Sequence, residues 1–141
     1  MDFRLEESLG FILNKTNTKL KNQLFQRFKE DDITPEQWSI LTCLWQQEGV
    51  SPKELADLIY KDKPNTNRIL EKLQAKGLIL RKLHPTDRRA YRIHLTERGW
   101  AIKDKLIAKV TQLQEEVTAG MEQEKVEEMK RLLNQMYANL N

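Results

Sequence analysis

The sequence predicts a mainly helical fold that contains one small β-hairpin, and three observations support this. Apolar residues recur at three- or four-residue steps through most of the 141-residue chain, which is the spacing of one helical face. A hydroxyl residue followed by proline opens a helical pattern twice, at Thr34-Pro35 and at Ser51-Pro52. After Gly77 the pattern changes to that of strands: residues 78–83 form a short apolar-rich run, and Tyr91, Ile93 and Leu95 alternate with Arg92 and His94. We therefore expect an α+β chain in which helices predominate.

Three helices are expected in the first part of the chain. Apolar residues form one face from Phe3 to Phe28, so this stretch predicts a long amphipathic helix that ends at the charged residues 29–32. Thr34 and Gln37 then have the spacing of a capping box and begin a second helix. A short third helix runs from Ser51 to about Tyr60, with Leu55, Ala56 and Ile59 facing inward.

The fourth predicted helix, at about 64–76, forms a helix-turn-helix with the third. Pro64 suits the first helical position, and Gly77 suits the left-handed residue that follows a helix. The two helices are joined by three residues, which is the spacing of a helix-turn-helix. In DNA-binding proteins of this type the second helix enters the major groove, and its N-terminal residues meet the base edges.

A hairpin and two further helices complete the predicted fold. Strands at 78–83 and 91–95 are separated by a segment rich in turn residues, so a wing is expected at about 83–91. Thr96 caps a helix that continues to Val117, and a last helix follows Gly120.

The charge of the chain is concentrated around this helix and hairpin. The segment from Lys61 to Arg92 contains ten basic and three acidic residues, a net charge of +7, whereas the remainder has 14 basic and 18 acidic residues, a net charge of −4. Phosphates attract such a cationic surface, and the major groove admits a helix. This distribution predicts double-stranded DNA as a partner.

Other functional classes have little support in the sequence. No apolar run approaches the roughly 20 residues of a membrane span, and the first residues do not resemble a signal peptide, so we expect a cytoplasmic protein with no membrane partner. No phosphate-binding glycine loop or nucleophile motif is present, so no enzymatic activity is expected.

His84 and His94 have no metal-ligand cluster around them, and we expect neither metal nor cofactor. Cys43 is interpreted as a buried structural thiol.

The order of these elements resembles the MarR family (multiple antibiotic resistance regulators) of bacterial winged-helix transcription factors. The wing signature of that family is matched by Asp87-Arg88-Arg89 and by Leu95-Thr96-Glu97-Arg98-Gly99. Residues 65–73, followed by Lys76-Gly77-Leu78-Ile79, resemble its recognition helix and exit. The resemblance implies a winged helix-turn-helix core flanked by long dimerisation helices. It divides the chain into an N-terminal dimerisation helix (1–30), a DNA-binding domain (34–95) and C-terminal dimerisation helices (96–141).

The resemblance also implies a mode of action. Members of the family are symmetric homodimers that bind palindromic or pseudo-palindromic operators, usually as repressors. Many of them release DNA when a small phenolic or lipophilic effector binds. One subgroup senses peroxides through a cysteine in the first helix, but no cysteine lies between Met1 and Glu30 here. Control through a thiol is therefore not expected.

Candidate DNA contacts fall into three groups. Four residues at the start of the recognition helix could meet base edges, although Asn and Thr there also suit a solvated, capped first turn: these are Asn65, Thr66, Asn67 and Arg68. The wing tip could enter the minor groove, and by the resemblance Arg89 is preferred over Arg88 for that role, while Asp87 would pair with a wing arginine. Phosphate contacts, or plain surface charges, are expected from Lys61, Lys63, Lys72 and Lys82.

The terminal helices carry apolar residues that could join two protomers or pack within one chain. We favour the dimer, because a palindromic site needs two recognition helices about one DNA turn apart. The expected interface residues are Leu5, Leu9, Ile12, Leu132, Leu133, Met136 and Leu140. The alternative function is a winged-helix architectural or protein-interaction adaptor that does not bind DNA sequence-specifically.

Overall fold

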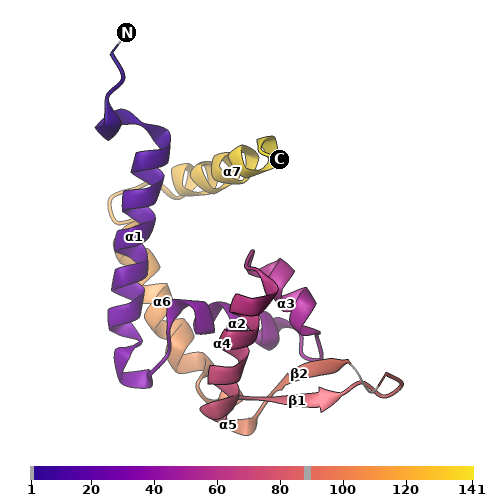
Figure 1. Cartoon of the computed structure of the whole chain (residues 1–141). Helices are drawn as coiled ribbons and strands as arrows, with labels where there is room; N and C mark the ends of the chain where they lie inside the picture. The colour runs from indigo at the N-terminus through magenta and orange to yellow at the C-terminus, as the bar shows by residue number, and fades with distance from the viewer. Residues whose placement is uncertain (1, 88–89) are drawn as a thin grey trace. The chain divides into compact units, whose positions relative to one another are not determined.

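A computed structural model describes residues 2–87 and 90–141 of the chain (Figure 1). Helices predominate and the strands form one antiparallel hairpin, which confirms the predicted fold class. No helix among the described residues is both long and apolar enough to cross a membrane. In chain order, the elements are the 3-10 helix η1 (Leu5–Glu7), α1 (Leu9–Arg27), the 3-10 helix η2 (Lys29–Asp31), α2 (Pro35–Gln46), α3 (Pro52–Leu58), α4 (Lys63–Ala75), β1 (Ile79–Leu83), β2 (Tyr91–Leu95), α5 (Glu97–Ala101), α6 (Lys103–Val117) and α7 (Gln123–Asn139).

The chain forms two compact units. The first extends to Lys109 and contains α1 to α5 with the start of α6; the second, from Val110 to Asn141, contains the remainder of α6 and α7. This boundary differs from the division expected from the sequence, because compactness groups the first helix with the winged core. The functional division into DNA-binding and dimerisation segments stays a prediction.

Most predicted helix starts are present, with two breaks that the sequence pattern did not indicate. Thr34 and Gln37 form the expected capping box, with Thr34 Oγ1 accepting from Gln37 N at 3.1 Å and Gln37 Oε1 accepting from Thr34 N at 3.2 Å. The first helix is interrupted at Ser8, whose hydroxyl caps α1. The helix after Thr96 is interrupted at Ile102, which separates α5 from α6.

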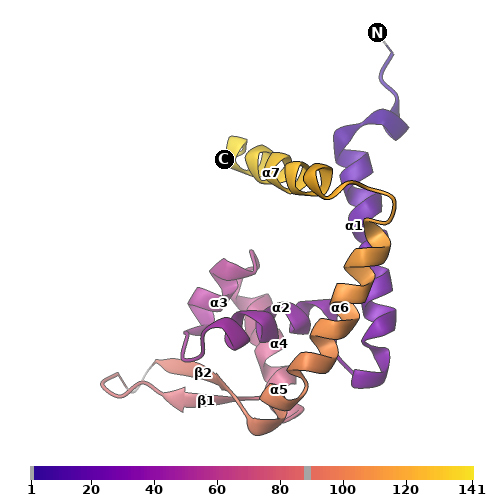
Figure 2. The same cartoon turned by 180° about the vertical axis from the view of Figure 1, so that it is seen from behind.

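The core of the first unit lies between α2, α3, α4 and the hairpin. Five side chains are fully buried there: Phe28 from the end of α1, Ile40 and Leu44 from α2, Leu70 from α4 and Ile93 from β2. Figures 1 and 2 show β1 and β2 beside α4 and extending past α3. Burial of these side chains therefore fixes the position of the helix-turn-helix relative to the wing.

Asp31 ties the end of the first helical segment to α6. Its side chain is buried and accepts hydrogen bonds from Lys105, at 2.7 Å, and from Lys109. Burial opposes the ionisation of Asp31, but the two lysines outweigh this cost and lower the pKa of the carboxyl below its ordinary value. Lys109 also donates to the Arg27 carbonyl and to Glu30, and the hydrogen bonds to Asp31 and Glu30 raise the pKa of this lysine.

β2 is bonded not only to β1 but also to the loop before α3. Val50 forms an isolated antiparallel bridge with Ile93, whose N–H donates to the Val50 carbonyl at 2.8 Å. The Gly49 N–H donates to the Ile93 carbonyl at 2.9 Å, and Arg92 Nη1 donates to the Gly49 carbonyl at 3.1 Å. These bonds attach β2 to the loop before α3. The wing is therefore anchored to the helix-turn-helix at its base.

A group of hydrogen bonds that we call the Thr96 clasp joins the end of α4 to α5. The hydroxyl of Thr96 donates to the Gly77 carbonyl at 2.6 Å and accepts from Gly99 N at 3.1 Å, while Thr96 N donates to the Leu78 carbonyl at 3.1 Å. Trp45 of α2 donates from Nε1 to the Gly99 carbonyl at 2.9 Å. Residues of the Leu-Thr-x-x-Gly motif thus form the hydrogen bonds that join α2, the end of α4, the hairpin and α5.

Replacing Gly99 with alanine should destabilise the protein, because an added Cβ would lie 2.2 Å from the Leu78 carbonyl oxygen. Leu78 O is backbone, so the clasp must shift, and we expect the free energy of unfolding to fall by about 2 kcal/mol. Gly10→Ala is the matched control, since its Cβ would meet no atom within 4 Å and should change stability by less than about 1 kcal/mol. Urea unfolding at one protein concentration measures both variants. Equal stability of Gly99→Ala and the wild type would contradict the role of the clasp.

Candidate nucleic-acid interface

The turn between α3 and α4 sets the direction of α4. It comprises residues 59–62, one more than the sequence predicted, and Tyr60 within it adopts a left-handed conformation with φ of 58°. Lys61 N donates to the Ala56 carbonyl at 3.1 Å, which closes the end of α3. Asp62, not Pro64, begins α4 as its N-cap. Sequence reasoning overlooked Asp62, although an aspartate before Lys63-Pro64 is a recognised start signal.

The first turns of α4 present Asn65 and Arg68 to solvent. Both residues are exposed, whereas Asn67 is half-buried. Asn65 lies between two charged neighbours: its Nδ2 donates to Asp62 Oδ2 at 2.8 Å, and its Oδ1 accepts from Arg68 Nη2. An amide and a guanidinium side by side on an exposed helical turn can together hydrogen-bond to the edges of adjacent base pairs.

The structure corrects the prediction for Thr66. Its side chain is fully buried, and its hydroxyl donates to the Asp62 carbonyl at 2.9 Å. A buried hydroxyl that is already bonded to the backbone cannot face a base edge. Thr66 therefore belongs to the core beneath the recognition helix, and three of the four predicted residues remain candidates for base contact.

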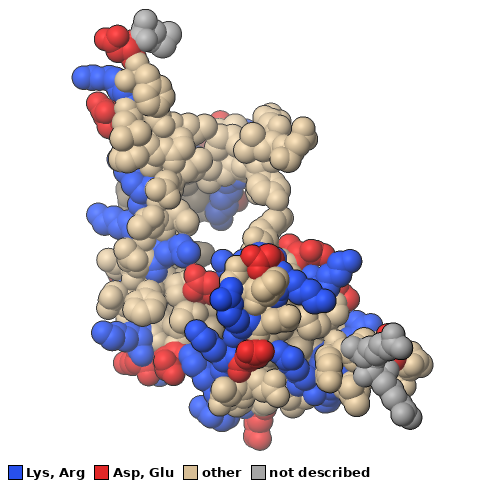
Figure 3. All heavy atoms as spheres, in the orientation of Figure 1, with Lys and Arg blue, Asp and Glu red and all other residues tan. Residues whose placement is uncertain are grey.

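Cations surround this turn, and the structure separates them into two kinds. Side chains of the first kind are exposed: Lys61, Lys63, Lys72 and Lys82. The space-filling view shows Lys and Arg side chains gathered over α3, α4 and the hairpin, with a few acids among them (Figure 3).

Cations of the second kind hold the fold together. Lys76 donates to Gln37 Oε1 at 2.8 Å and to the Asp32 carbonyl, and Arg92 pairs with Glu54 at 3.6 Å. Exposed lysines can approach phosphates without breaking internal contacts, so the first kind suits backbone contacts better.

The described part of the wing tip begins with a turn organised by His84. The ring Nδ1 of His84 accepts from Thr86 N and Asp87 N, each at 3.2 Å. Arg88 and Arg89, the predicted minor-groove residues, lie outside the described residues, and so does any pairing of Asp87 with them. Within the described residues no cluster of three or more His, Cys, Asp or Glu side chains could hold a metal ion.

Cys43 has the environment of a structural thiol. It lies in α2 and is half-buried, and desolvation raises the pKa of its thiol. A higher pKa leaves less thiolate at neutral pH, and thiolate is the form that reacts with oxidants. The thiol is less buried than the sequence interpretation expected, and its structural role stays a prediction.

An exposed amide and guanidinium at the start of the second helix, a surrounding set of exposed lysines and an adjacent hairpin define a winged-helix DNA-binding regulator. Comparisons with known proteins agree. Residues 33–91 match the MarR family. The organic hydroperoxide resistance transcriptional regulator of Bacillus subtilis is 30% identical over 104 residues, which make up 74% of this chain and 71% of that protein. The chain belongs to the MarR family of transcriptional regulators.

Solved structures give the same result over almost the whole chain. A mutant MarR from E. coli, complexed with operator DNA, superposes with a TM-score of 0.85 at 27% identity, covering 91% of this chain and 92% of that one. BpsR of Bordetella bronchiseptica, whose DNA binding is regulated by 6-hydroxynicotinic acid, shares the fold with a TM-score of 0.90 at 20% identity, covering 97% of this chain and 98% of that one. None of these findings favours the adaptor alternative.

Asn65→Ala and Lys72→Ala should weaken DNA binding in different ways. Removing the Asn65 amide should cost about 1–3 kcal/mol on the preferred duplex and relax the base preference at one position of each half-site. Removing the Lys72 charge should weaken binding to all sequences similarly and lower the slope of log affinity against log salt by about 1. Fluorescence anisotropy titrations over a salt series measure both effects. Identical profiles for the two variants would contradict the separation of base readers from phosphate contacts.

Proposed function

We propose that the protein is a dimeric repressor that binds a pseudo-palindromic operator and releases it when a small effector binds. The observation that carries this proposal is the pair of exposed side chains, Asn65 and Arg68, on the capped first turns of a helix surrounded by exposed lysines. Each protomer would place α4 in the major groove and the hairpin near the adjacent minor groove. Action on chromosomal DNA would place the protein in the bacterial cytoplasm.

Exposed apolar side chains on the terminal segments support the dimer. Leu9 is 59% exposed and Ile12 is 40% exposed in the first unit; Leu132 is 45% and Leu140 is 76% exposed in the second. Large apolar side chains left in water at helical spacing mark surfaces that a partner covers. A second copy of the chain is the partner that a two-fold symmetric operator requires. The remaining predicted interface residues, Leu5, Leu133 and Met136, lie on the same segments.

The wild-type protein should select an inverted repeat from a library of random duplexes. Its half-sites should be separated by about one helical turn, roughly 34 Å, because two recognition helices must fit successive major grooves on one face of the DNA. Affinity for the selected duplex should lie at about 10⁻⁸ to 10⁻¹¹ M and fall steeply as salt is added. Sequencing of bound duplexes and gel-shift titration provide the measurements. Enrichment of no repeat would favour the adaptor alternative.

A hollow beside α2 is the candidate effector site. Its lining combines apolar, aromatic and cationic side chains from α1, α2 and the loop after α3: Asn17, Leu20, Lys21, Leu24, Pro35, Glu36, Trp38, Ser39, Ile59 and Lys61. Such a lining suits a small aromatic acid, whose ring packs against Trp38 while its carboxylate meets a lysine. Lys61 is also a candidate phosphate contact, so an anion held by this lysine would bind at the expense of DNA.

Two substitutions in this hollow should change effector affinity in opposite directions. Lys21 Nζ lies 3.4 Å from Glu36 Oε1. Burial disfavours the charge of Glu36, but a backbone hydrogen bond and Lys21 outweigh it and lower the pKa of this carboxyl, which keeps Glu36 negative at neutral pH. Lys21→Met should therefore weaken binding of 4-hydroxybenzoate about tenfold, and Glu36→Gln should strengthen it, by charge–charge interaction alone.

Tryptophan fluorescence titration measures these affinities, and the neutral analogue 4-hydroxybenzyl alcohol is the control. Its affinity should respond little to either substitution, because it carries no carboxylate. If both variants bound 4-hydroxybenzoate as the wild type does, the hollow would not be the effector site.

A further inference from the structure

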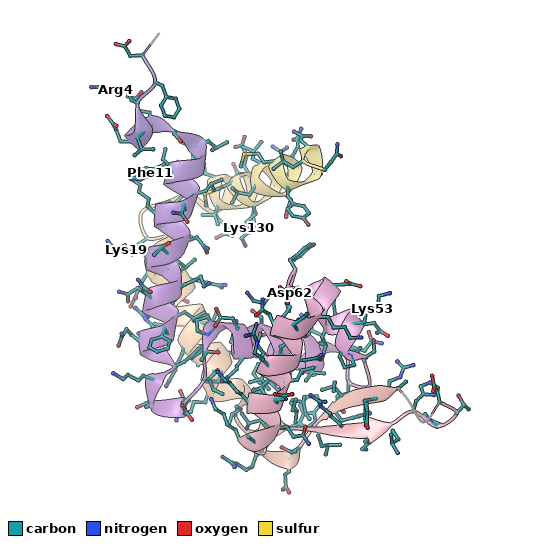
Figure 4. All side chains as sticks on the ribbon, viewed as in Figure 1. Arg4, Phe11, Lys19, Lys53, Asp62 and Lys130 are labelled. Atoms are coloured by element: carbon teal, nitrogen blue, oxygen red, sulfur yellow. The ribbon has the colours of Figure 1, made fainter. Side chains whose placement is uncertain are left out.

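Asp62 is an acidic residue within the most basic part of the chain. It is one of three acids between Lys61 and Arg92, and it is exposed at the start of α4 (Figure 4). A carboxylate at this place repels the phosphates that the surrounding lysines attract. Serine or threonine would cap the helix equally well without this repulsion, as Ser51 does for α3. Capping alone therefore does not explain why the residue is an aspartate.

The two oxygens of Asp62 perform different tasks. Oδ1 accepts from the backbone N–H of Asn65 at 2.8 Å, which is the capping bond. Oδ2 accepts from the side-chain Nδ2 of the same residue, also at 2.8 Å. An ionised carboxylate can only accept hydrogen bonds, so the amide must turn its NH2 group toward Asp62. A hydroxyl cap has one oxygen, which can donate as well as accept, so it would not impose one direction on the amide.

The orientation of the Asn65 amide then determines what faces Arg68. With Nδ2 directed to Asp62, Oδ1 is directed to the guanidinium, and Arg68 Nη2 donates to it. The three exposed side chains form a hydrogen-bonded series, which we call the Asp62 ladder, in which each donor and acceptor has one direction. Asn65 keeps one N–H and one lone pair for a base edge, and Arg68 keeps its other N–H donors.

We propose that Asp62 is a positioning residue that sets the operator preference by fixing the Asn65 amide and the Arg68 guanidinium before DNA binds. The carboxylate lowers the affinity for DNA of any sequence. It also holds the Asn65 amide and the Arg68 guanidinium in a single arrangement, which raises specificity. This proposal rests on the DNA-binding function proposed above and adds to it a residue that touches no base.

Three full-length variants test the ladder by duplex selection, followed by anisotropy titrations on the selected operator and on its single-base variants. Asp62→Ser keeps a capping oxygen but frees the amide, so discrimination at the base pairs facing α4 should fall about tenfold. Asp62→Asn keeps the shape, but its own NH2 group can face Asn65 and reverse the amide, so the preferred base at that position should change. Glu71→Gln removes one negative charge elsewhere on α4 and should keep the wild-type preference.

The same preferred bases and the same discrimination ratios in wild type, Asp62→Ser and Asp62→Asn would overturn the proposal. A uniform loss of affinity together with a lower melting temperature would also overturn it, because Asp62 would then be only a helix cap. Failure of the wild type to select any repeat would instead refute the proposed function.

A DNA-free measurement then decides on the ladder itself. Exchange of the Asn65 side-chain amide protons, followed by NMR, should be slower in the wild type than in Asp62→Ser. Equal exchange rates would overturn the ladder whatever the protein does with DNA.

Discussion

The hydrogen bonds from Thr96 to the residues just after α4 are the contacts on which the rest of the DNA-binding face depends. The hydroxyl and backbone N–H of Thr96 donate to the carbonyls of Gly77 and Leu78, two residues of the short link between α4 and β1. Gly99 makes this approach possible, because any side chain there would collide with the backbone. The recognition helix, the first strand of the wing and α5 therefore meet at one rigid junction, and the helix and the wing keep a fixed relative position.

The cations of the DNA-binding face differ in whether they already have partners within the protein. Lys76 and Arg92 are engaged in internal contacts, whereas Lys61, Lys63 and Lys72 point to solvent. This division explains how a window of net charge +7 can both fold and bind DNA. Some cations satisfy carbonyls and carboxylates within the protein, and the others remain for phosphates. Net charge alone indicates the partner but not which side chains meet it.

Local signals in the sequence predict most of the helices and strands, but they do not predict which side chains are buried. The capping box at Thr34 was predictable because all its partners lie within four residues. The break at Ser8 was missed because the apolar period continues through it, and the Val50 bridge was missed because a single pair of residues has no period. Thr66 was assigned to the wrong side of α4, since the rotation of a helix about its axis depends on packing against distant residues. The role of Gly99 likewise depends on Leu78, a residue of a distant chain segment.

We expect α4 to read bases through Asn65 and Arg68 on a fixed scaffold. A crystal structure of the full chain on its selected duplex tests this most directly. The first turns of α4 should lie in the major groove, with both side chains within hydrogen-bond distance of base edges and Thr66 still buried. A complex in which Asn65 and Arg68 contact only phosphates, or in which α4 lies outside the groove, would contradict it.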